Sequence, residues 1–498
     1  MEKPSKAVVP FEIAETTIDA IRTVLESGQL SARELVQTYL DRIEALDRNG
    51  PSINSIISIN PRALEEADRL DAALASSGPV GPLHGVPVIL KDQIDAKGMA
   101  TTLGSVLFKD YFPDRDAFVV ERLTAAGAII LAKATLGEMG GGDTHGSLFG
   151  STRNPYALDR TVGGSSGGPA AGVAANLGAV AIGQEAMASI RRPSAWCNIV
   201  GMRPTSGLVS RSGVYMGWPG TQASLGPMTR TVRDAAILLD ALVGYDPEDP
   251  VTAMGVGQHA QSYVASLDAA ALRGARVGVL REPMGVGTAP DSDDFMKVSA
   301  VFDLAVAEIA SAGATVIDPV TIPRLKELLA KRAPGPDAAP GWDVYFGRSA
   351  NPPFRDKEAM AASPDFEKVV NKFMARVGAW DATAHYEYLI ARDELMTSLM
   401  QVMADLNLDA IVHKSAEHQP TLLGDRGKPG FVAMWGATHL NTFLVSVPSI
   451  SVPIGFTSDD LPAGMTFLGR PFSDATVIRL AYAYEQAEDH RRAPTFGA

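Results

Sequence analysis

The sequence is poor in cysteine and carries less positive than negative charge. Cys197 is its one cysteine in 498 residues, so no disulfide can form within the chain, which fits a reducing compartment. Lysine and arginine number 44 against 57 acidic residues, a net charge of −13 that disfavours nucleic acid as a partner. No run of about 18 apolar residues occurs, and the N-terminus lacks the apolar core of a signal peptide. We therefore expect a cytoplasmic protein that binds neither nucleic acid nor membrane.

Apolar residues make up 46% of the chain, enough for a large buried core. In residues 1–75 they recur at helical spacing, and Ser31-Ala-Arg-Glu34 has the form of a helix capping box. Further along, helical segments alternate with short apolar runs, which favours an α/β fold in one compact domain. The predicted strands are 86–90, 128–132, 276–280, 314–317, 449–453 and 465–468, and the predicted helices include 116–126 and about 365–405.

Two stretches depart from this alternation. Residues 136–170 are rich in glycine, serine and threonine, yet apolar segments frame them too closely for an interdomain linker. Residues 332–356 contain five prolines and several glycines. That composition is typical of an irregular segment, and we expect this one to form a loop over a functional site.

The block Gly163-Gly-Ser-Ser-Gly-Gly168 is the most informative segment. A small-residue helix is predicted after it, and Ile182 to Arg191 follows. A phosphate-binding loop would need Gly-Lys-Ser or Gly-Lys-Thr at the end of the block, and Pro169 stands there instead. Composition alone also allows a flexible linker, although linkers rarely lie between a strand and a helix.

Several motifs occur in a fixed order over nearly the whole chain. They are His84-Gly-Val-Pro-Val-Ile-Leu-Lys-Asp92, the Gly163–Gly168 block, Ser189-Ile-Arg-Arg-Pro193, Cys197 through Gly-Met-Arg-Pro-Thr205, Gly226-Pro-Met-Thr-Arg230, and Leu461-Pro-Ala-Gly-Met through Gly469-Arg-Pro-Phe472. In this order and at these spacings the sequence resembles the amidase signature family. The resemblance implies an α/β fold, a single large domain over 1–498 with a central mixed β-sheet covered on both faces by helices. Residues 1–75 would be an N-terminal helical part and 76–240 the catalytic signature core.

The resemblance also implies a Ser-cisSer-Lys triad. Its lysine corresponds to Lys91, its serine after a cis peptide bond to Ser165, and its nucleophile to Ser189. The backbone N–H groups of Ala186, Met187, Ala188 and Ser189 would form the oxyanion hole, and Ser166 would orient Lys91 or Ser165.

A lysine in this role has a physical requirement that the residues themselves address. A serine hydroxyl needs a base, and lysine is a base only when neutral, although its ordinary pKa is about 10.4. Lys91 directly follows the apolar run 86–90, and burial would lower its pKa. From the residues alone, an ordinary ion pair of Lys91 with Asp92 or Asp95 is the favoured interpretation.

The segment before Ser189 departs from the family pattern. Members usually read Gly-Thr-Asp-x-Gly-Gly-Ser, whereas this chain reads Gly183-Gln-Glu-Ala-Met-Ala-Ser189. Glycines allow a positive φ that Met187 and Ala188 resist, so we expect a reshaped oxyanion loop in which Met187 can intrude on the pocket. Glu185 is expected to pair with Arg191 and brace this loop. A degenerate member without activity is the alternative.

Other polar residues near the motifs carry weaker signals. Cys197 is expected to be a small buried thiol, and His145 either lines the cleft or is a plain loop histidine. No His, Cys and Asp cluster has the spacing of metal ligands, so we expect neither a metal nor another cofactor.

The candidate substrate-binding residues are mostly apolar or lack side chains, although such residues are often ordinary core. They are Met139, Gly140, Gly141, Gly142, Phe149, Met216, Trp218 and Trp435, with Leu148 and Tyr215 beside them. Pockets for apolar ligands are built in this way. The resulting hypothesis is a hydrolase of amide-type C–N bonds that forms an acyl-enzyme with a neutral, bulky amide, anilide or carbamate (urethane), acting as a monomer or homodimer. The alternatives are the amidase-like subunit of a tRNA-dependent amidotransferase, which needs partner chains, and an inactive binding homologue.

Overall fold

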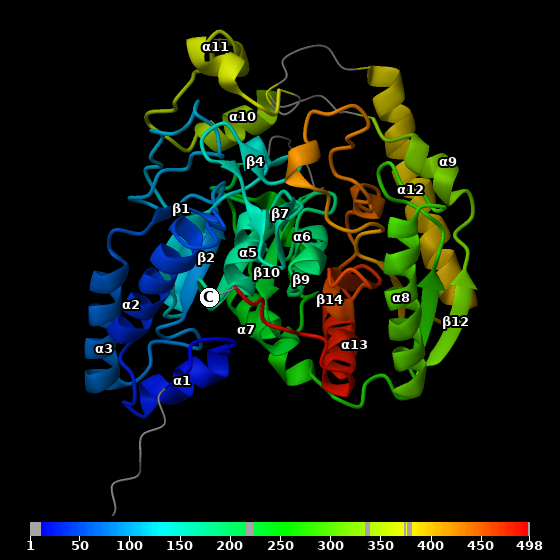
Figure 1. The fold of residues 1–498 in the computed structure, drawn as a ribbon, viewed down its shortest axis with the longest axis horizontal. Coiled ribbons are helices and arrows are strands. Elements are labelled where there is room, and N and C mark those ends of the chain that lie inside the picture. The colour runs from blue at the N-terminus through cyan, green and yellow to red at the C-terminus, as the bar shows by residue number, and fades with distance from the viewer. Residues whose placement is uncertain (1–10, 216–222, 334–338, 373–374, 376–380, 497–498) are drawn as a thin grey trace, which may run out of the picture.

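The computed structural model describes residues 11–215, 223–333, 339–372, 375 and 381–496. In these residues eleven strands form one sheet through the middle of the molecule (Figure 1). From one edge to the other they are β1 (Ile56–Ile59), β3 (Ile129–Ala134), β2 (Pro87–Lys91), β8 (Val180–Glu185), β10 (Ser224–Thr229), β9 (Val200–Arg203), β14 (Ser449–Phe456), β15 (Pro462–Leu468), β13 (Ala410–Lys414), β11 (Arg276–Leu280) and β12 (Thr315–Val320). The predicted strands all appear, with bounds shifted by a few residues.

The sheet is mixed. β2 is parallel to both β3 and β8, and β11 is parallel to both β13 and β12, while the strands between these groups pair antiparallel. A parallel pair needs a crossover connection, and α4 (Phe118–Ala125) and α8 (Asp293–Ser311) supply it between β2 and β3 and between β11 and β12. Two small sheets, β4 (His145–Gly146) with β5 (Gly150–Ser151) and β6 (Arg153–Asn154) with β7 (Ala157–Thr161), complete the strands of the described residues.

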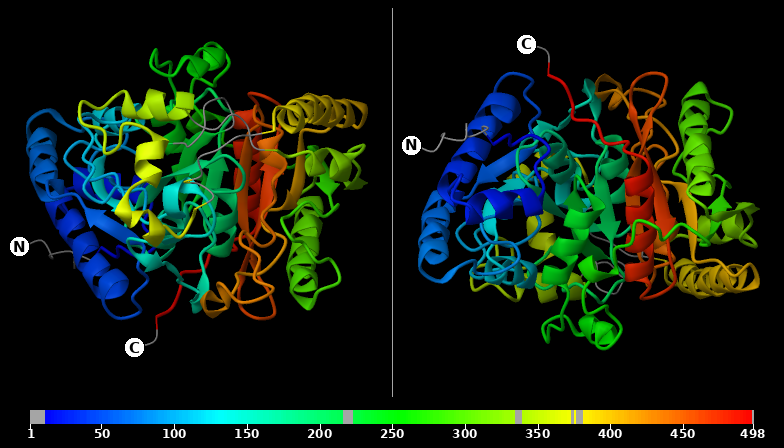
Figure 2. Two further views of the ribbon diagram at one scale, coloured as in Figure 1. Left: turned by 90° about the horizontal axis from the view of Figure 1, so that it is seen from above. Right: turned by 90° about the horizontal axis from the view of Figure 1, so that it is seen from below.

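Helices cover both faces of the sheet (Figure 2). On β13, Ile411 packs in one cluster with Leu395 of the long helix α12, whereas Val412 packs in another with Phe302 of α8. Since alternate residues of a strand point to opposite faces, α12 and α8 lie on opposite sides. The remaining helices are α1 (Ile18–Glu26), α2 (Ala32–Arg42), α3 (Ala63–Ser77), α5 (Gly167–Ala174), α6 (Arg191–Trp196), α7 (Val232–Leu242), α9 (Leu325–Ala330), α10 (Ala339–Phe346), α11 (Lys357–Ala361) and α13 (Asp474–Ala487), and α12 itself is Ala382–Asp405.

Short helical turns lie between these elements. They are a π-helical turn at Ile43–Arg48 and 3₁₀ turns at Glu138–Gly140, Pro250–Gly255, Val264–Ser266, Pro364–Lys368, Leu423–Asp425 and Leu440–Thr442. No helix in the described ranges is both long enough and apolar enough to cross a membrane.

Three predictions about secondary structure need correction. The N-terminal part is not all helical, because β1 pairs antiparallel with β3 at the sheet edge; four residues are too few for a periodic signal. Residues 332–356 are not wholly irregular, since they contain α10. The helix expected from about 365 begins only at Ala382, where the Asp381 side chain caps it. The capping box of Ser31 and Glu34 is present at the start of α2.

The topology brings the motif residues to one edge of the sheet. β2 ends at Lys91 and its parallel neighbour β8 ends at Glu185, so both strands end on the same side. The Gly163–Gly168 block lies just before β8 in sequence and leads into α5, which packs on β2 and β8. In open α/β sheets the carboxyl ends of parallel strands are where ligands bind.

Candidate active site

Lys91 lies at the end of β2 with no exposed surface. Its Nζ is 2.7 Å from Ser165 Oγ. Burial lowers the pKa of Lys91 well below its ordinary value, and the nearby negative charge of Glu185 opposes this shift only in part. The predicted pair of a lysine and a serine is therefore in contact, and the lysine is in surroundings that favour the neutral amine.

The alternative ion pairs of Lys91 do not form. Asp92 pairs with Lys133 instead, with 3.1 Å between Lys133 Nζ and Asp92 Oδ1. Asp95 accepts hydrogen bonds from the hydroxyls of Tyr345 (2.6 Å) and Thr101 (2.9 Å). That interpretation of the sequence is wrong because neighbouring residues in a strand point to opposite sides, which sends Lys91 and Asp92 to different partners.

The Gly163–Gly168 block holds Ser165 by close backbone packing. The Gly164–Ser165 peptide bond is cis, as the family resemblance implies. A Cβ on Gly164 would lie 2.4 Å from the Gly142 carbonyl oxygen, so glycine is required there. The Gly137 N–H donates to the Ser165 carbonyl oxygen (3.0 Å). The loop at 137–142 thus supports the residue that contacts Lys91.

Of the three predicted triad residues, Ser189 alone has access to solvent. It is 7% exposed, whereas Lys91 and Ser165 have no exposed surface. Its carbonyl oxygen accepts a hydrogen bond from the Ser166 N–H (3.0 Å), which ties it to the glycine-serine block. Its hydroxyl makes no hydrogen bond with any described residue, so it is available to another molecule. The Ser166 hydroxyl donates to the Gln184 carbonyl oxygen (3.1 Å), and no hydrogen bond joins it to Lys91 or Ser165.

The loop before Ser189 is braced as predicted. Glu185 and Arg191 form a fully buried ion pair of 2.7 Å, and the Glu185 carboxylate also accepts the N–H groups of Ile190 and Arg191. Arg191 Nη2 in turn donates to the Met187 carbonyl oxygen (2.7 Å). Two backbone donors and a guanidinium thus fix the shape of the loop.

Although the loop before Ser189 lacks the two glycines usual in the family, its backbone N–H groups remain free to donate hydrogen bonds. Among the described residues, no acceptor takes the N–H groups of Ala186, Met187, Ala188 or Ser189. None of these residues has a positive φ. Met187 and Ala188 pack with Ala437, Val286 and Met434 in a small apolar cluster. The replaced glycines therefore change the lining near Ser189 while the loop adopts ordinary backbone angles.

Breaking the Glu185–Arg191 pair is expected to destabilise the protein strongly. Arg191→Met leaves the Glu185 carboxylate buried without its partner, which typically costs about 3–5 kcal/mol of unfolding free energy. Arg33→Met, at an ion pair with Asp68 that is about half exposed, is the matched control and should cost at most about 1 kcal/mol. Urea denaturation followed by circular dichroism measures both. Equal losses in the two variants would show that the buried pair does not brace the loop.

The predicted substrate-binding residues are only partly brought together. Met139 is buried with Tyr215 in an aromatic cluster that also contains Leu103, Phe108, Tyr111, Trp342, Tyr345 and Phe346. Trp342, Tyr345 and Phe346 belong to α10, so this helix packs in the same cluster as Met139 of the loop beside Ser165. Phe149 packs on Gly104 and Gly146. Met216 and Trp218 lie outside the described residues.

Trp435 lies against His418. The two rings are 4.4 Å apart, and the indole N–H donates to Asp294 Oδ2 (3.3 Å). Its neighbours Met434 and Ala437 pack against Met187. Sequence reasoning passed over both of these residues, because only the fold brings this distant segment to the loop before Ser189.

Hydrogen bonds from Asn371 hold the loop Gly140–Gly142 in place. Asn371 Nδ2 donates to the carbonyl oxygens of Gly141 (2.9 Å) and Glu138 (3.2 Å). The buried Glu138 carboxylate accepts the N–H groups of Val370 (2.7 Å) and Asn371 (2.8 Å). Sequence reasoning missed this clamp because its two halves lie far apart along the chain.

The remaining polar candidates are either buried or hydrogen-bonded to neighbouring residues. Cys197 is fully buried, which raises the pKa of its thiol. His145 Nδ1 is 2.7 Å from Ser151 Oγ across the β4–β5 pair, as a plain loop histidine would be.

Glu308, Glu488 and His490 bring possible metal-ligand atoms within 4.8 Å of one another, a group that sequence spacing could not reveal. His490 Nε2 and Glu308 Oε2 are already hydrogen-bonded to each other (2.9 Å).

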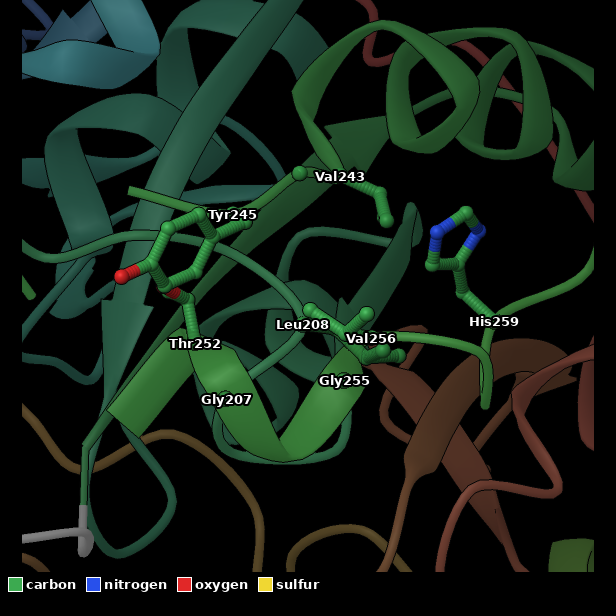
Figure 3. A pocket seen from close by; sticks show the side chains of 9 residues that line it. Gly207, Leu208, Val243, Tyr245, Thr252, Gly255, Val256 and His259 are labelled. Atoms are coloured by element: carbon green, nitrogen blue, oxygen red, sulfur yellow. The ribbon is translucent and has the colours of Figure 1, made fainter. Parts of the chain in front are cut away.

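A hollow of about 190 Å³ opens elsewhere on the described surface (Figure 3). Val243 and Val256 lie toward the His259 ring, Tyr245 and Thr252 lie at the opposite side, and none of its lining residues is a predicted site residue. The full lining is Gly207, Leu208, Val243, Gly244, Tyr245, Thr252, Gly255, Val256 and His259.

Comparison with known proteins agrees with the motif resemblance. A sequence model of the amidase family matches residues 34–478. The chain belongs to the amidase family. This membership makes it a hydrolase of the amidase signature class. It is 32% identical to a glutamyl-tRNA(Gln) amidotransferase subunit from Gloeobacter violaceus, over 97% of this chain and 99% of that one.

Solved structures of amidase-family enzymes share the fold. Native peptide amidase from Stenotrophomonas maltophilia superposes with a TM-score of 0.84 and is 33% identical, covering 98% of this chain and 100% of the other. A bacterial aryl acylamidase of the amidase signature family superposes with a TM-score of 0.79 and is 26% identical, covering 96% and 97%. The single large α/β domain with a mixed central sheet is thus the fold of these enzymes.

Proposed function

We propose that this amidase-family chain hydrolyses amide-type C–N bonds of small molecules through Ser189, Ser165 and Lys91 and an acyl-enzyme. The observation that carries the proposal is the 2.7 Å contact between Ser165 Oγ and the Nζ of a fully buried lysine. Burial favours the neutral amine, and a neutral amine beside a hydroxyl can act as its base.

In the proposed reaction two protons move in sequence. Lys91 Nζ takes the Ser165 proton, Ser165 Oγ takes the Ser189 proton, and Ser189 Oγ bonds to the substrate carbonyl carbon. As the C–N bond breaks, Ser165 gives a proton to the leaving nitrogen. Lys91 then returns its proton to Ser165. Water, deprotonated by the same route, then releases the acid from Ser189 and restores the enzyme.

The oxyanion of the tetrahedral intermediate needs hydrogen-bond donors, and the free N–H groups of residues 186–189 are the proposed ones. They precede or belong to the nucleophile, and the buried Glu185–Arg191 pair holds their loop in shape. Donors fixed before the reaction need no reorganisation as charge develops, and each is typically worth about 10²–10³ in rate.

For the substrate we propose a neutral, bulky amide such as an anilide or an aryl carbamate. Three observations support this choice. The residues packed with Met187 beside the nucleophile are apolar, and the aromatic cluster of α10 lies on the loop that supports Ser165. Both a peptide amidase and an aryl acylamidase are among the similar structures. Apolar walls with few polar anchors favour a ligand without charge.

A competition assay tests this substrate class. We expect kcat/KM for a nitroanilide or an aryl carbamate to exceed that for a primary aliphatic amide. A tenfold preference for the small primary amide, about 1.4 kcal/mol of transition-state energy, would instead identify a general small-amide amidase. A fluorophosphonate probe, run in parallel, should label Ser189; a folded protein that it leaves unlabelled would be an inactive binding homologue.

A second candidate function is that of the amidase-like subunit of a tRNA-dependent amidotransferase. The identity of 32% to the glutamyl-tRNA(Gln) amidotransferase subunit over almost the full length favours it. The two candidates differ in what the purified chain does alone. Turnover of anilides or carbamates by the isolated chain supports the hydrolase. Amide turnover and ammonia transfer that appear only with added partner chains, co-eluting in size-exclusion chromatography, support the amidotransferase role.

A further inference from the structure

Within the described part of the chain, Gln184 supplies two of the three hydrogen-bond contacts of Lys91 Nζ. Besides the 2.7 Å contact to Ser165 Oγ, Nζ lies 3.2 Å from the Gln184 carbonyl oxygen and 3.4 Å from the Gln184 amide oxygen Oε1. Ser166 holds the Gln184 backbone on both sides, by donating to its carbonyl oxygen (3.1 Å) and accepting its N–H (3.3 Å). The end of β8 therefore faces the lysine with two fixed oxygens.

These three neighbours differ in what they can donate. A carbonyl oxygen and an amide oxygen only accept hydrogen bonds, whereas the Ser165 hydroxyl can both accept and donate. A neutral lysine amine has two N–H groups and one lone pair. With both N–H groups directed at the Gln184 oxygens, the lone pair is left for the hydroxyl proton of Ser165.

We propose that Gln184 is a positioning residue, whose two oxygens hold both N–H groups of neutral Lys91 so that the lone pair faces the Ser165 hydroxyl. The inference rests on the proposed function and adds to it the orientation of the base. An amide nitrogen in the place of Oε1 would donate to the lone pair and compete with Ser165. Once protonated, the amine keeps its two hydrogen bonds to Gln184 and donates the third to Ser165, so one side-chain position serves both directions of proton transfer.

The charges around Lys91 are already paired. On β8 the charge of Glu185 is held by Arg191 of α6, and on β2 and β3 Asp92 is paired with Lys133. Burial lowers the pKa of Lys91 and Glu185 partly offsets this. Gln184 orients the amine without adding a net charge, so the neutral form is preserved. A charged residue at this position would alter that balance.

Removing the amide oxygen tests the positioning role. Gln184→Met keeps the length of the side chain and removes the acceptor. We expect kcat to fall roughly tenfold, the scale of one neutral hydrogen bond, with KM unchanged because no substrate contact is lost. Gln419→Met, at another buried glutamine whose amide nitrogen donates to Thr457 (2.6 Å), should keep the wild-type kcat. A kcat within about twofold of wild type in Gln184→Met overturns the proposal.

The pH dependence of the rate in a charged variant is a second test. It would stay unchanged if Gln184 only supported the fold. In Gln184→Glu a carboxylate close to Nζ favours the ammonium form, so the acidic fall of the rate should move to higher pH by about one unit or more. If the fall of the rate at acidic pH stays at the wild-type position in Gln184→Glu, the proposal is overturned. This test still applies if the Gln184→Met variant does not fold. Failure of the proposed function looks different: the wild-type protein itself then shows neither turnover nor fluorophosphonate labelling at Ser189.

Discussion

Ser189→Ala is expected to lower kcat by at least about 10⁴-fold while the protein stays folded. The alanine variant lacks the oxygen that bonds to the substrate carbonyl, whereas the remaining site still binds and polarises the substrate. Stability should change little, since the Ser189 hydroxyl makes no hydrogen bond with the described residues. Steady-state kinetics on the preferred anilide or carbamate measures the loss, and thermal unfolding checks the fold.

A nearby serine offers the matched control. Ser194, on α6, is fully buried, and its hydroxyl has no hydrogen-bond partner in the described part of the chain. Ser194→Ala should therefore keep most of the activity. With a slow substrate, mass spectrometry of the wild-type enzyme should find the acyl group on the peptide that contains Ser189. An adduct on another residue, or substantial turnover by Ser189→Ala, contradicts the assignment.

Lys91→Met is expected to lower kcat by roughly 10²–10⁴-fold, the usual contribution of a general base. Methionine fills the buried space at the end of β2 but offers no lone pair of comparable basicity. In the wild-type enzyme, the lowered pKa of Lys91 keeps the amine neutral to lower pH than usual. The rate should therefore fall as the pH drops through this pKa, because protonation removes the base.

A variant of a second buried lysine tests whether the fall of the rate at acidic pH is specific to Lys91. Lys414, at the end of β13, has a pKa lowered to about 8 by burial, and its Nζ donates to Ser299 (2.8 Å) far along the sheet from β2. Lys414→Met should leave the acidic fall of the rate unchanged. A rate that rises steadily toward low pH in the wild-type enzyme, with chemistry limiting, would exclude Lys91 as the base.

Part of the site geometry that the motifs indicated is local in origin. Glu185 and Arg191 are close in sequence, and the turn between β8 and α6 brings them together. The Gly163–Gly168 block leads directly into a helix that packs on β2 and β8. Interactions over a few residues depend on turn and strand geometry, which sequence patterns express well.

The contacts that sequence reasoning missed join distant segments. The Glu138 clamp on Asn371 links the loop beside Ser165 to a segment more than two hundred residues later, which the sequence pattern predicted as part of a helix. Met434 and Ala437 reach Met187 across a similar separation. Gln184 lay within the motif but was masked by the more conspicuous loss of two glycines. Its role depends on which face of β8 its side chain takes, and on where Lys91 ends on the neighbouring strand.

Periodicity and ordered motifs can be read without coordinates, and they were enough to predict the fold class and the family and to propose Lys91, Ser165 and Ser189 as the triad. The sequence left open whether Lys91 forms an ordinary ion pair. The tertiary structure decided this, because the pKa of an amine depends on burial and on neighbours from other strands. By sending Asp92 to Lys133 and Asp95 to Tyr345, the fold leaves Lys91 with two oxygens of Gln184 and one hydroxyl. Burial and the neighbouring groups in the folded protein set whether a lysine is a charged ammonium or a neutral base. The spacing of residues along the chain does not contain this information.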